Sequence, residues 1–208
     1  MATNPNNNLT AVALVCTLKP SPTESSSELL ASQLLAELDK LGVTGSSVRV
    51  VDFDVRPGVE TDMGGGDEWP NIRAKILAAD ILVLATPTWM GHPSSIANQV
   101  LERLDAELGE TDENGRPDVA GKVAIVGVVG NEDGAHQIVA ELLQALNDVG
   151  FSVASQASTY WNGEAMAKVD YKDLPKTPDS VTSATHMAAV NAVHLAGLLA
   201  ATPFPAES

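Results

Sequence analysis

Six hydroxyl side chains lie in the segment that follows the first apolar run of the sequence. They are Thr17, Ser21, Thr23 and the three serines of residues 25–27, and a leucine-rich segment with helical spacing begins directly after them. Hydroxyl groups and the unpaired N–H groups of a helix N-terminus together suit an anion such as a phosphate monoester, and Lys19 adds one positive charge. Because a single serine is enough to cap a helix, capping by these serines is the simpler alternative and stays open.

A second segment, residues 86–95, reads Thr-Pro-Thr-Trp-Met-Gly-His-Pro-Ser-Ser and joins an apolar run to a helical one. Its two prolines stiffen it, its glycine permits a close approach, and Trp89 with Met90 offers a flat apolar surface. A rigid loop of this kind suits a planar aromatic ligand. In the alternative interpretation, Trp89 covers the core and Ser94 caps the next helix.

The third segment, residues 130–134, is short and bounded by glycines, so its backbone amides can face the edge of a ligand. His136 follows at the start of a helical segment, and a structural role is the simpler expectation for it. His92 and His136 form no helical i, i+4 pair with metal-ligand spacing, so no metal site is expected. Cys16 lies in an apolar run and is expected to be an inert core thiol.

Five apolar runs alternate with five helical patterns and must position these segments. The predicted strands are residues 9–17, 48–53, 80–85, 122–129 and 151–157, and the helices lie around 30–41, 69–76, 96–108, 138–149 and 181–199. This alternation predicts an α/β fold with a doubly wound five-stranded parallel sheet in the order 2-1-3-4-5. In such sheets ligands bind beyond the carboxyl ends of the strands, where the three segments would meet. Residues 54–68 are predicted as a long loop without periodicity.

The composition restricts the partners of the chain. Its 208 residues carry 12 Lys and Arg against 27 Asp and Glu, a formal charge of −15, which is unsuited to nucleic acid or anionic membranes. No apolar run approaches the ~20 residues of a membrane span, and no signal peptide is evident, so a soluble cytoplasmic protein is expected. We expect a disordered leader over 1–8, a single domain over 9–201 and a tail over 202–208.

The three segments together resemble the flavodoxin-like FMN proteins, and within them the NAD(P)H-dependent FMN reductase and quinone reductase branch. The first resembles the phosphate loop of that branch. The second, followed by Ile-Ala-Asn-Gln-Val-Leu-Glu-Arg-Leu-Asp, resembles its Pro-Thr-aromatic-x-Gly loop, and residues 130–134 fall at its third loop. The first loop departs from the family pattern at Pro20, Pro22 and Lys19, and the third departs from it through Glu132 and Asp133.

The resemblance implies a set of flavin-binding residues. Those expected to hold the ribityl phosphate are Thr17, Lys19, Ser25, Ser26 and Ser27. Those expected to line the isoalloxazine are Pro87, Thr88, Trp89, Met90 and Gly91, with Gly130, Asn131, Glu132, Asp133 and Gly134 on its far side. No catalytic side chain is implied, because the flavin itself carries the chemistry. Residues 159–174 have no counterpart in the family motifs, but they follow the last predicted strand and so also lie at the carboxyl edge. Tyr160 or Trp161 is a candidate to reach the flavin or a subunit interface, and plain packing is the simpler role for Trp161.

Three functions follow as hypotheses. The first is an enzyme that binds FMN, takes a hydride from NADH or NADPH and passes electrons to a quinone or another small acceptor. Such an enzyme is expected to be a homodimer or homotetramer, with residues 54–68 and 159–179 as candidate contacts. The second is a flavodoxin-type electron carrier without NAD(P)H activity. The third is a flavin-free binding protein that keeps the fold.

Overall fold

The computed structural model describes residues 9–205, so the predicted leader and the last three residues of the predicted tail lie outside the described residues. Six strands are found: β1 (Thr10–Val15), β2 (Thr44–Arg49), β3 (Ile81–Trp89), β4 (His92–Pro93), β5 (Val123–Gly130) and β6 (Ser152–Asn162). The α-helices are α1 (Ser26–Lys40), α2 (Trp69–Ala78), α3 (Ser95–Leu104), α4 (Ala135–Asp148) and α5 (Asp179–Ala201). Short 3-10 turns η1 (Val50–Asp52), η2 (Asp105–Leu108) and η3 (Tyr171–Asp173) complete the described part.

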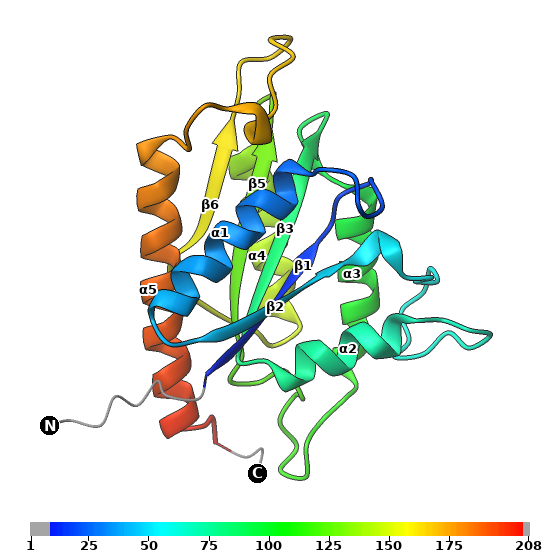
Figure 1. Ribbon diagram of the computed structural model, residues 1–208. Helices are drawn as coiled ribbons and strands as arrows, with labels where there is room; N and C mark the ends of the chain where they lie inside the picture. Colours follow the sequence, from blue (N-terminus) through cyan, green and yellow to red (C-terminus); the bar gives the residue numbers. More distant parts are fainter. Residues whose placement is uncertain (1–8, 206–208) are drawn as a thin grey trace, which may run out of the picture.

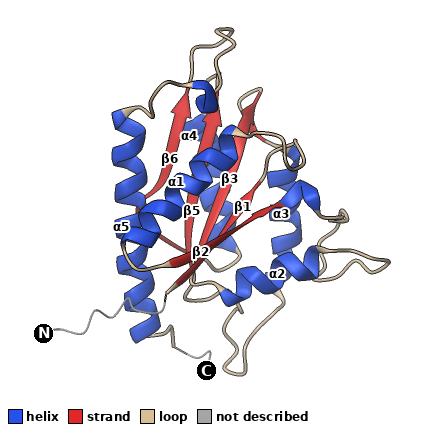
Figure 2. Cartoon of the chain, in the orientation of Figure 1, coloured by secondary structure: helices blue, strands red, loops and turns tan. Residues whose placement is uncertain are grey.

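The five long strands form a parallel sheet in the order β2-β1-β3-β5-β6, which confirms the predicted doubly wound architecture (Figure 1). Helices α1 and α5 cover one face, where small and branched side chains of β1, β3 and β5 meet an Ala-rich stripe of α5. Helices α2, α3 and α4 cover the other face. The loops that follow β3, β5 and β6 gather at the upper edge of the sheet (Figure 2).

The second strand lies earlier than predicted. It spans Thr44–Arg49, and Val50 already belongs to the 3-10 turn η1, so the predicted span of residues 48–53 is wrong. Strand β2 is an edge strand whose first four residues are exposed, and therefore its first half carries no apolar run. The position of β2 is set by its hydrogen-bonded pairing with β1, in which Thr44 lies opposite Thr10.

The third strand continues further than predicted, through Pro87 to Trp89, and then turns back. Met90 and Gly91 both have positive φ, 54° and 77°, and they connect β3 to the two-residue strand β4. Two consecutive residues in that conformation form the tight turn typical of a β-hairpin. The segment predicted as a loop is therefore a hairpin, with Trp89 opposite His92.

Helix α5 bears on the expectation that no segment spans a membrane. By length and composition alone it could span a membrane, the single such helix among residues 9–205, although 33% of its most apolar stretch is buried inside the fold. Val181, Ala188, Ala192 and Ala196 are buried on its inner side. Helix α5 therefore packs as a core helix of the sheet.

Candidate functional site

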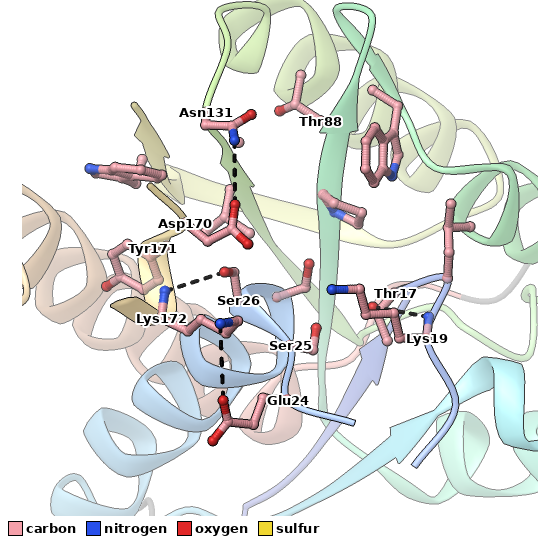
Figure 3. Close-up of a pocket in the computed structure, with 17 residues that line it drawn as sticks. Thr17, Lys19, Glu24, Ser25, Ser26, Thr88, Asn131, Asp170, Tyr171 and Lys172 are labelled. Atoms are coloured by element: carbon pink, nitrogen blue, oxygen red, sulfur yellow. Dashed lines mark hydrogen bonds and ion pairs between the residues drawn. The ribbon is translucent and has the colours of Figure 1, made fainter. Parts of the chain in front are cut away.

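A pocket opens at the carboxyl ends of β1, β3 and β5, where the topology places the three segments singled out in the sequence (Figure 3). Ten of the fifteen predicted site residues line it: Thr17, Lys19, Ser25, Ser26, Ser27, Pro87, Thr88, Trp89, Gly130 and Asn131. Leu18, Glu24, Val129, Trp161, Asp170, Tyr171 and Lys172 complete the lining. The fold thus brings hydroxyl groups, aromatic rings and two lysines to one place.

The first loop ends in a capped helix. Ser25 accepts a hydrogen bond from the N–H of Glu28 at 3.4 Å, so the capping alternative is correct for this serine. Ser26 and Ser27 begin α1, and N–H groups in a first helical turn have no partner within the helix. Ser26 and Ser27 therefore bring free N–H groups of the α1 N-terminus to the lining of the pocket.

Arg49 supports the first loop from beneath. Its guanidinium donates to the carbonyl oxygens of Lys19, at 3.2 Å, and Thr23, at 2.8 Å, and it also pairs with Glu28. Arg49 is buried, and its hydrogen bonds fix the backbone of the first loop. The lining of the pocket accordingly takes its positive charge from lysines.

The hairpin places Trp89 at the mouth of the pocket. Trp89 is 52% exposed, so the alternative in which it covers the core is wrong. The other part of that alternative is correct, because Ser94 caps α3 by accepting from the N–H of Ala97 at 3.1 Å. The Ser94 hydroxyl also donates to the carbonyl of Cys16 at 2.6 Å, which ties the hairpin to the end of β1. Cys16 is buried, and its burial raises the thiol pKa far above the usual range.

The second and third loops contact each other closely. A Cβ atom on Gly130 would lie 2.6 Å from the Cβ of Thr88, and one on Gly134 would lie 2.7 Å from the Cα of Gly91. The N–H of Met90 donates to the Glu132 carboxylate at 2.9 Å. Glycine is therefore required at both positions by space, and at Gly134 also by a φ of 119°.

Thr88 presents a hydroxyl that the described residues leave without a partner. The side chain is only 4% exposed, its oxygen is fully buried, and the residue lines the pocket. A buried hydroxyl without a hydrogen bond is costly, and such a group is commonly completed by a ligand or by water. Because Thr88 also lines the pocket, a bound ligand is one candidate partner for this hydroxyl.

The segment after β6 supplies residues that the sequence motifs did not identify. The Tyr171 hydroxyl donates to Gln33 of α1 at 2.6 Å, its ring lies 5.6 Å from that of Trp161, and Asn131 donates to Asp170 at 3.3 Å. Burial raises the pKa of the Tyr171 hydroxyl. We call residues 170–172 the strap, because they connect the third loop to α1 across the pocket.

Tyr160 and five predicted residues lie elsewhere. Tyr160 contacts His136, with 2.8 Å between the hydroxyl and Nε2. Outside the pocket lining are Met90, Gly91, Glu132, Asp133 and Gly134, which form the turns of the two loops. Within residues 9–205, no three His, Cys, Asp or Glu side chains gather in a way that could hold a metal ion.

Comparison with known proteins agrees with this geometry. Residues 10–165 match the model of a family described as NADPH-dependent FMN reductase. The chain belongs to that family. It is therefore a member of a group of FMN-dependent oxidoreductases, with FMN as cofactor and NADPH or NADH as the family's reductant. This confirms the expected cofactors and the flavodoxin-like fold.

Two curated relatives align over nearly the whole chain. The chain is 32% identical over 209 residues to the 8-demethyl-8-aminoriboflavin-5'-phosphate synthase of Streptomyces davaonensis, covering 96% of this chain and 81% of that protein. It is 33% identical over 201 residues to a divalent metal cation transporter MntH of Mycobacterium bovis, covering 93% of this chain but only 29% of the relative. A solved structure of RosB with a bound intermediate, 8-demethyl-8-formylriboflavin-5'-phosphate, superposes with a TM-score of 0.85 at 31% identity, covering 94% and 82% of the two chains.

The residues that line the pocket fit FMN. The hydroxyl-rich N-terminus of α1 suits the phosphate of FMN. Trp89 and Trp161 provide aromatic surface for its rings, and the buried hydroxyl of Thr88 has no hydrogen-bond partner among the described residues. Glu24 and Asp170 also line the pocket, so its charge is mixed.

Proposed function

We propose that this chain binds FMN in the described pocket and catalyses electron transfer from NADPH or NADH to a small acceptor such as a quinone. The observation that carries the proposal is that one pocket joins the serine-rich N-terminus of α1 to Trp89 and Trp161. An anion-binding end and an aromatic end are the two features that an aromatic ligand with a terminal phosphate requires.

In this proposal each group of residues has a positioning role. FMN, held by the residues of this pocket, would supply the redox chemistry that links the nicotinamide to the acceptor. The backbone and hydroxyl groups of Ser26 and Ser27 hold the phosphate, and Thr88 donates to a polar atom of the ligand. Trp89, half exposed at the mouth, orients the ring and limits the approach of water. A quinone that leaves as a hydroquinone takes two electrons from NAD(P)H and two protons, one from NAD(P)H and one from solvent.

A second candidate function is chemical modification of the flavin itself. It is favoured by the likeness, at 32% identity over 96% of this chain, to an 8-demethyl-8-aminoriboflavin-5'-phosphate synthase. In that case FMN would be the substrate of the same pocket. The cytoplasmic location and the homodimeric or homotetrameric assembly stay predictions in either case.

One series of measurements tests these functions. The protein is incubated with FMN, freed of unbound flavin by gel filtration, and its visible spectrum is recorded before and after anaerobic NADPH or NADH. Bleaching by NAD(P)H and recovery on adding a quinone is the expected result. Retained flavin that neither nucleotide bleaches contradicts the reductase and leaves the carrier hypothesis. Failure to retain any FMN overturns the proposed site.

Mass spectrometry of the recovered flavin separates the second candidate from the first. After aerobic incubation with NAD(P)H and possible amino donors, an unchanged FMN mass supports a cofactor role. A new flavin mass supports the modifying function.

A further inference from the structure

Lys172 is held against the phosphate-binding end of the pocket by its own backbone. Its main-chain N–H donates to the hydroxyl of Ser26 at 3.3 Å, although the two residues are 146 positions apart in the sequence. Its side chain is 22% exposed and lines the pocket. In Figure 3, Lys172 and Lys19 lie on either side of Ser25 and Ser26.

The ammonium group of Lys172 lies among carboxylates. It is 2.7 Å from Asp173 and 4.0 Å from Glu24, and the hydrogen bond to Asp173 raises the pKa of Lys172. The group therefore stays charged at neutral pH. Glu24 is exposed and its contact is long, so an anion with higher charge at the α1 N-terminus would compete for the ammonium group.

The two other cationic side chains near the first loop, Arg49 and Lys19, differ from Lys172 in position and contacts. Arg49 lies beneath the loop, with its guanidinium bonded to carbonyl oxygens and Glu28, and it does not line the pocket. Lys19 lines the pocket from the first loop and is exposed. Lys172 is the less exposed of the two lining lysines, and it is bonded through its backbone to the first residue of α1.

We propose that Lys172 is a phosphate-binding residue, delivered by the strap, that makes the pocket specific for 5'-phosphorylated flavin over riboflavin. This inference rests on the proposed FMN site and adds a residue outside the first loop. The strap is anchored by Tyr171 to Gln33 and by Asp170 to Asn131, and the main-chain N–H of Lys172 bonds Ser26, so the backbone that carries the ammonium group is already fixed beside the α1 N-terminus. A cation positioned in this way contributes more binding than a freely moving one, because less conformational entropy is lost.

The test compares FMN with riboflavin, which has the same ring and ribityl chain but no phosphate. Dissociation constants are measured by quenching of flavin fluorescence for the wild type, Lys172→Gln, Lys172→Arg and Lys168→Gln. Lys168 is an exposed lysine just before the strap and lies outside the pocket lining, so it controls for net charge. The Lys172 variants keep the main-chain N–H that bonds Ser26.

Lys172→Gln is expected to weaken FMN about tenfold or more and to leave riboflavin unchanged, since a hydrogen bond to a charged group is lost. Lys172→Arg should restore most of the FMN affinity, and Lys168→Gln should match the wild type. Glu24→Gln should strengthen FMN binding by removing a competing carboxylate. Thermal unfolding of the flavin-free Lys172→Gln variant should equal that of the wild type.

The outcomes that overturn the inference are distinct from those that overturn the site. Equal weakening of FMN and riboflavin by Lys172→Gln, or no weakening of either, overturns the role of Lys172 while the wild type still binds FMN. A wild type that binds neither flavin overturns the proposed function together with this inference.

Discussion

Arg103 and Asp67 form an ion pair in which both side chains are completely buried, with 2.7 Å between Arg103 Nη1 and Asp67 Oδ2. The guanidinium also donates to the carbonyl oxygens of Arg56 and Glu60 and lies 5.5 Å from the centre of the Trp69 ring. Residues 54–68, which have no periodicity in the sequence, are therefore fastened to α3 at several points. Several contacts with the Arg103 guanidinium therefore fix the path of this segment.

Removing one partner of this pair should destabilise the protein strongly. Asp67→Asn or Arg103→Leu leaves an uncompensated buried group and is expected to cost about 3–5 kcal/mol of unfolding free energy. Denaturant unfolding measures this cost. Lys176→Ala, which breaks an exposed pair with Asp179, serves as the control and should cost no more than about 1 kcal/mol. Similar losses for the two pairs would contradict the structural role of Arg103.

The Arg103–Asp67 pair should make the free energy of unfolding fall at low pH. Burial alone would raise the pKa of Asp67, but N–H groups of the loop and the Arg103 guanidinium lower it from 3.8 to about 2. Because the folded-state pKa is depressed, the stabilisation is complete above about pH 4 and is lost as the pH falls toward 2. Its size is about 2 kcal/mol. The stability difference between the wild type and Asp67→Asn should shrink over this range, and a constant difference would refute the prediction.

Thr88 and Thr86 provide a matched test of the unpartnered hydroxyl. In the flavin-free protein Thr88→Val should leave stability unchanged or raise it, since no described residue bonds the Thr88 oxygen. FMN affinity should fall about fivefold to tenfold if this hydroxyl bonds the ligand. Thr86→Val removes an acceptor that the N–H of Ser94 uses at 3.1 Å, so it should lower stability by about 1–3 kcal/mol. Unchanged FMN affinity in Thr88→Val would exclude Thr88 from the site.

The buried strands were predictable from the sequence because each is a run of apolar residues bounded by turn residues. Strand β5 differs from its prediction by one residue at each end, and Gly42, with a φ of 85°, ends the first helix region as expected. Edge strand β2 was misplaced because an exposed strand needs no apolar residues, and its position depends on pairing with β1. Local pattern therefore predicts the core strands better than the edges.

The site was predictable where it consists of loops that directly follow strands. The strap was missed as a set of named residues, because Asp170, Tyr171 and Lys172 form no motif. Their contacts, such as that of the Lys172 N–H with Ser26, depend on the tertiary path of the chain after β6. The topological rule placed the segment after the last strand at the same edge, but it could not single out residues 170–172 within that segment. A contact between residues 146 positions apart, such as that of Lys172 with Ser26, leaves no pattern in the nearby sequence.

Alanine variants of Trp89 and Trp69 distinguish a tryptophan that contacts the ligand from one that packs in the core. Trp89 is 52% exposed at the mouth of the pocket, whereas Trp69 is fully buried in the core. Trp89→Ala should change the unfolding free energy by no more than about 1 kcal/mol, whereas Trp69→Ala should cost about 3–5 kcal/mol.

The effect on flavin affinity should be larger for Trp89→Ala than for Trp69→Ala, the reverse of their effects on stability. An aromatic contact contributes about 0.5–1.5 kcal/mol beyond the area it buries, so Trp89→Ala should weaken FMN several-fold and alter the bound flavin's visible spectrum. Riboflavin should weaken by the same factor, because both ligands carry the ring that Trp89 contacts. Fluorescence titration with both flavins and unfolding of the flavin-free variants measure these effects. A Trp89→Ala protein that is much less stable yet binds FMN with unchanged affinity and spectrum would show that this tryptophan packs the fold and does not contact the flavin.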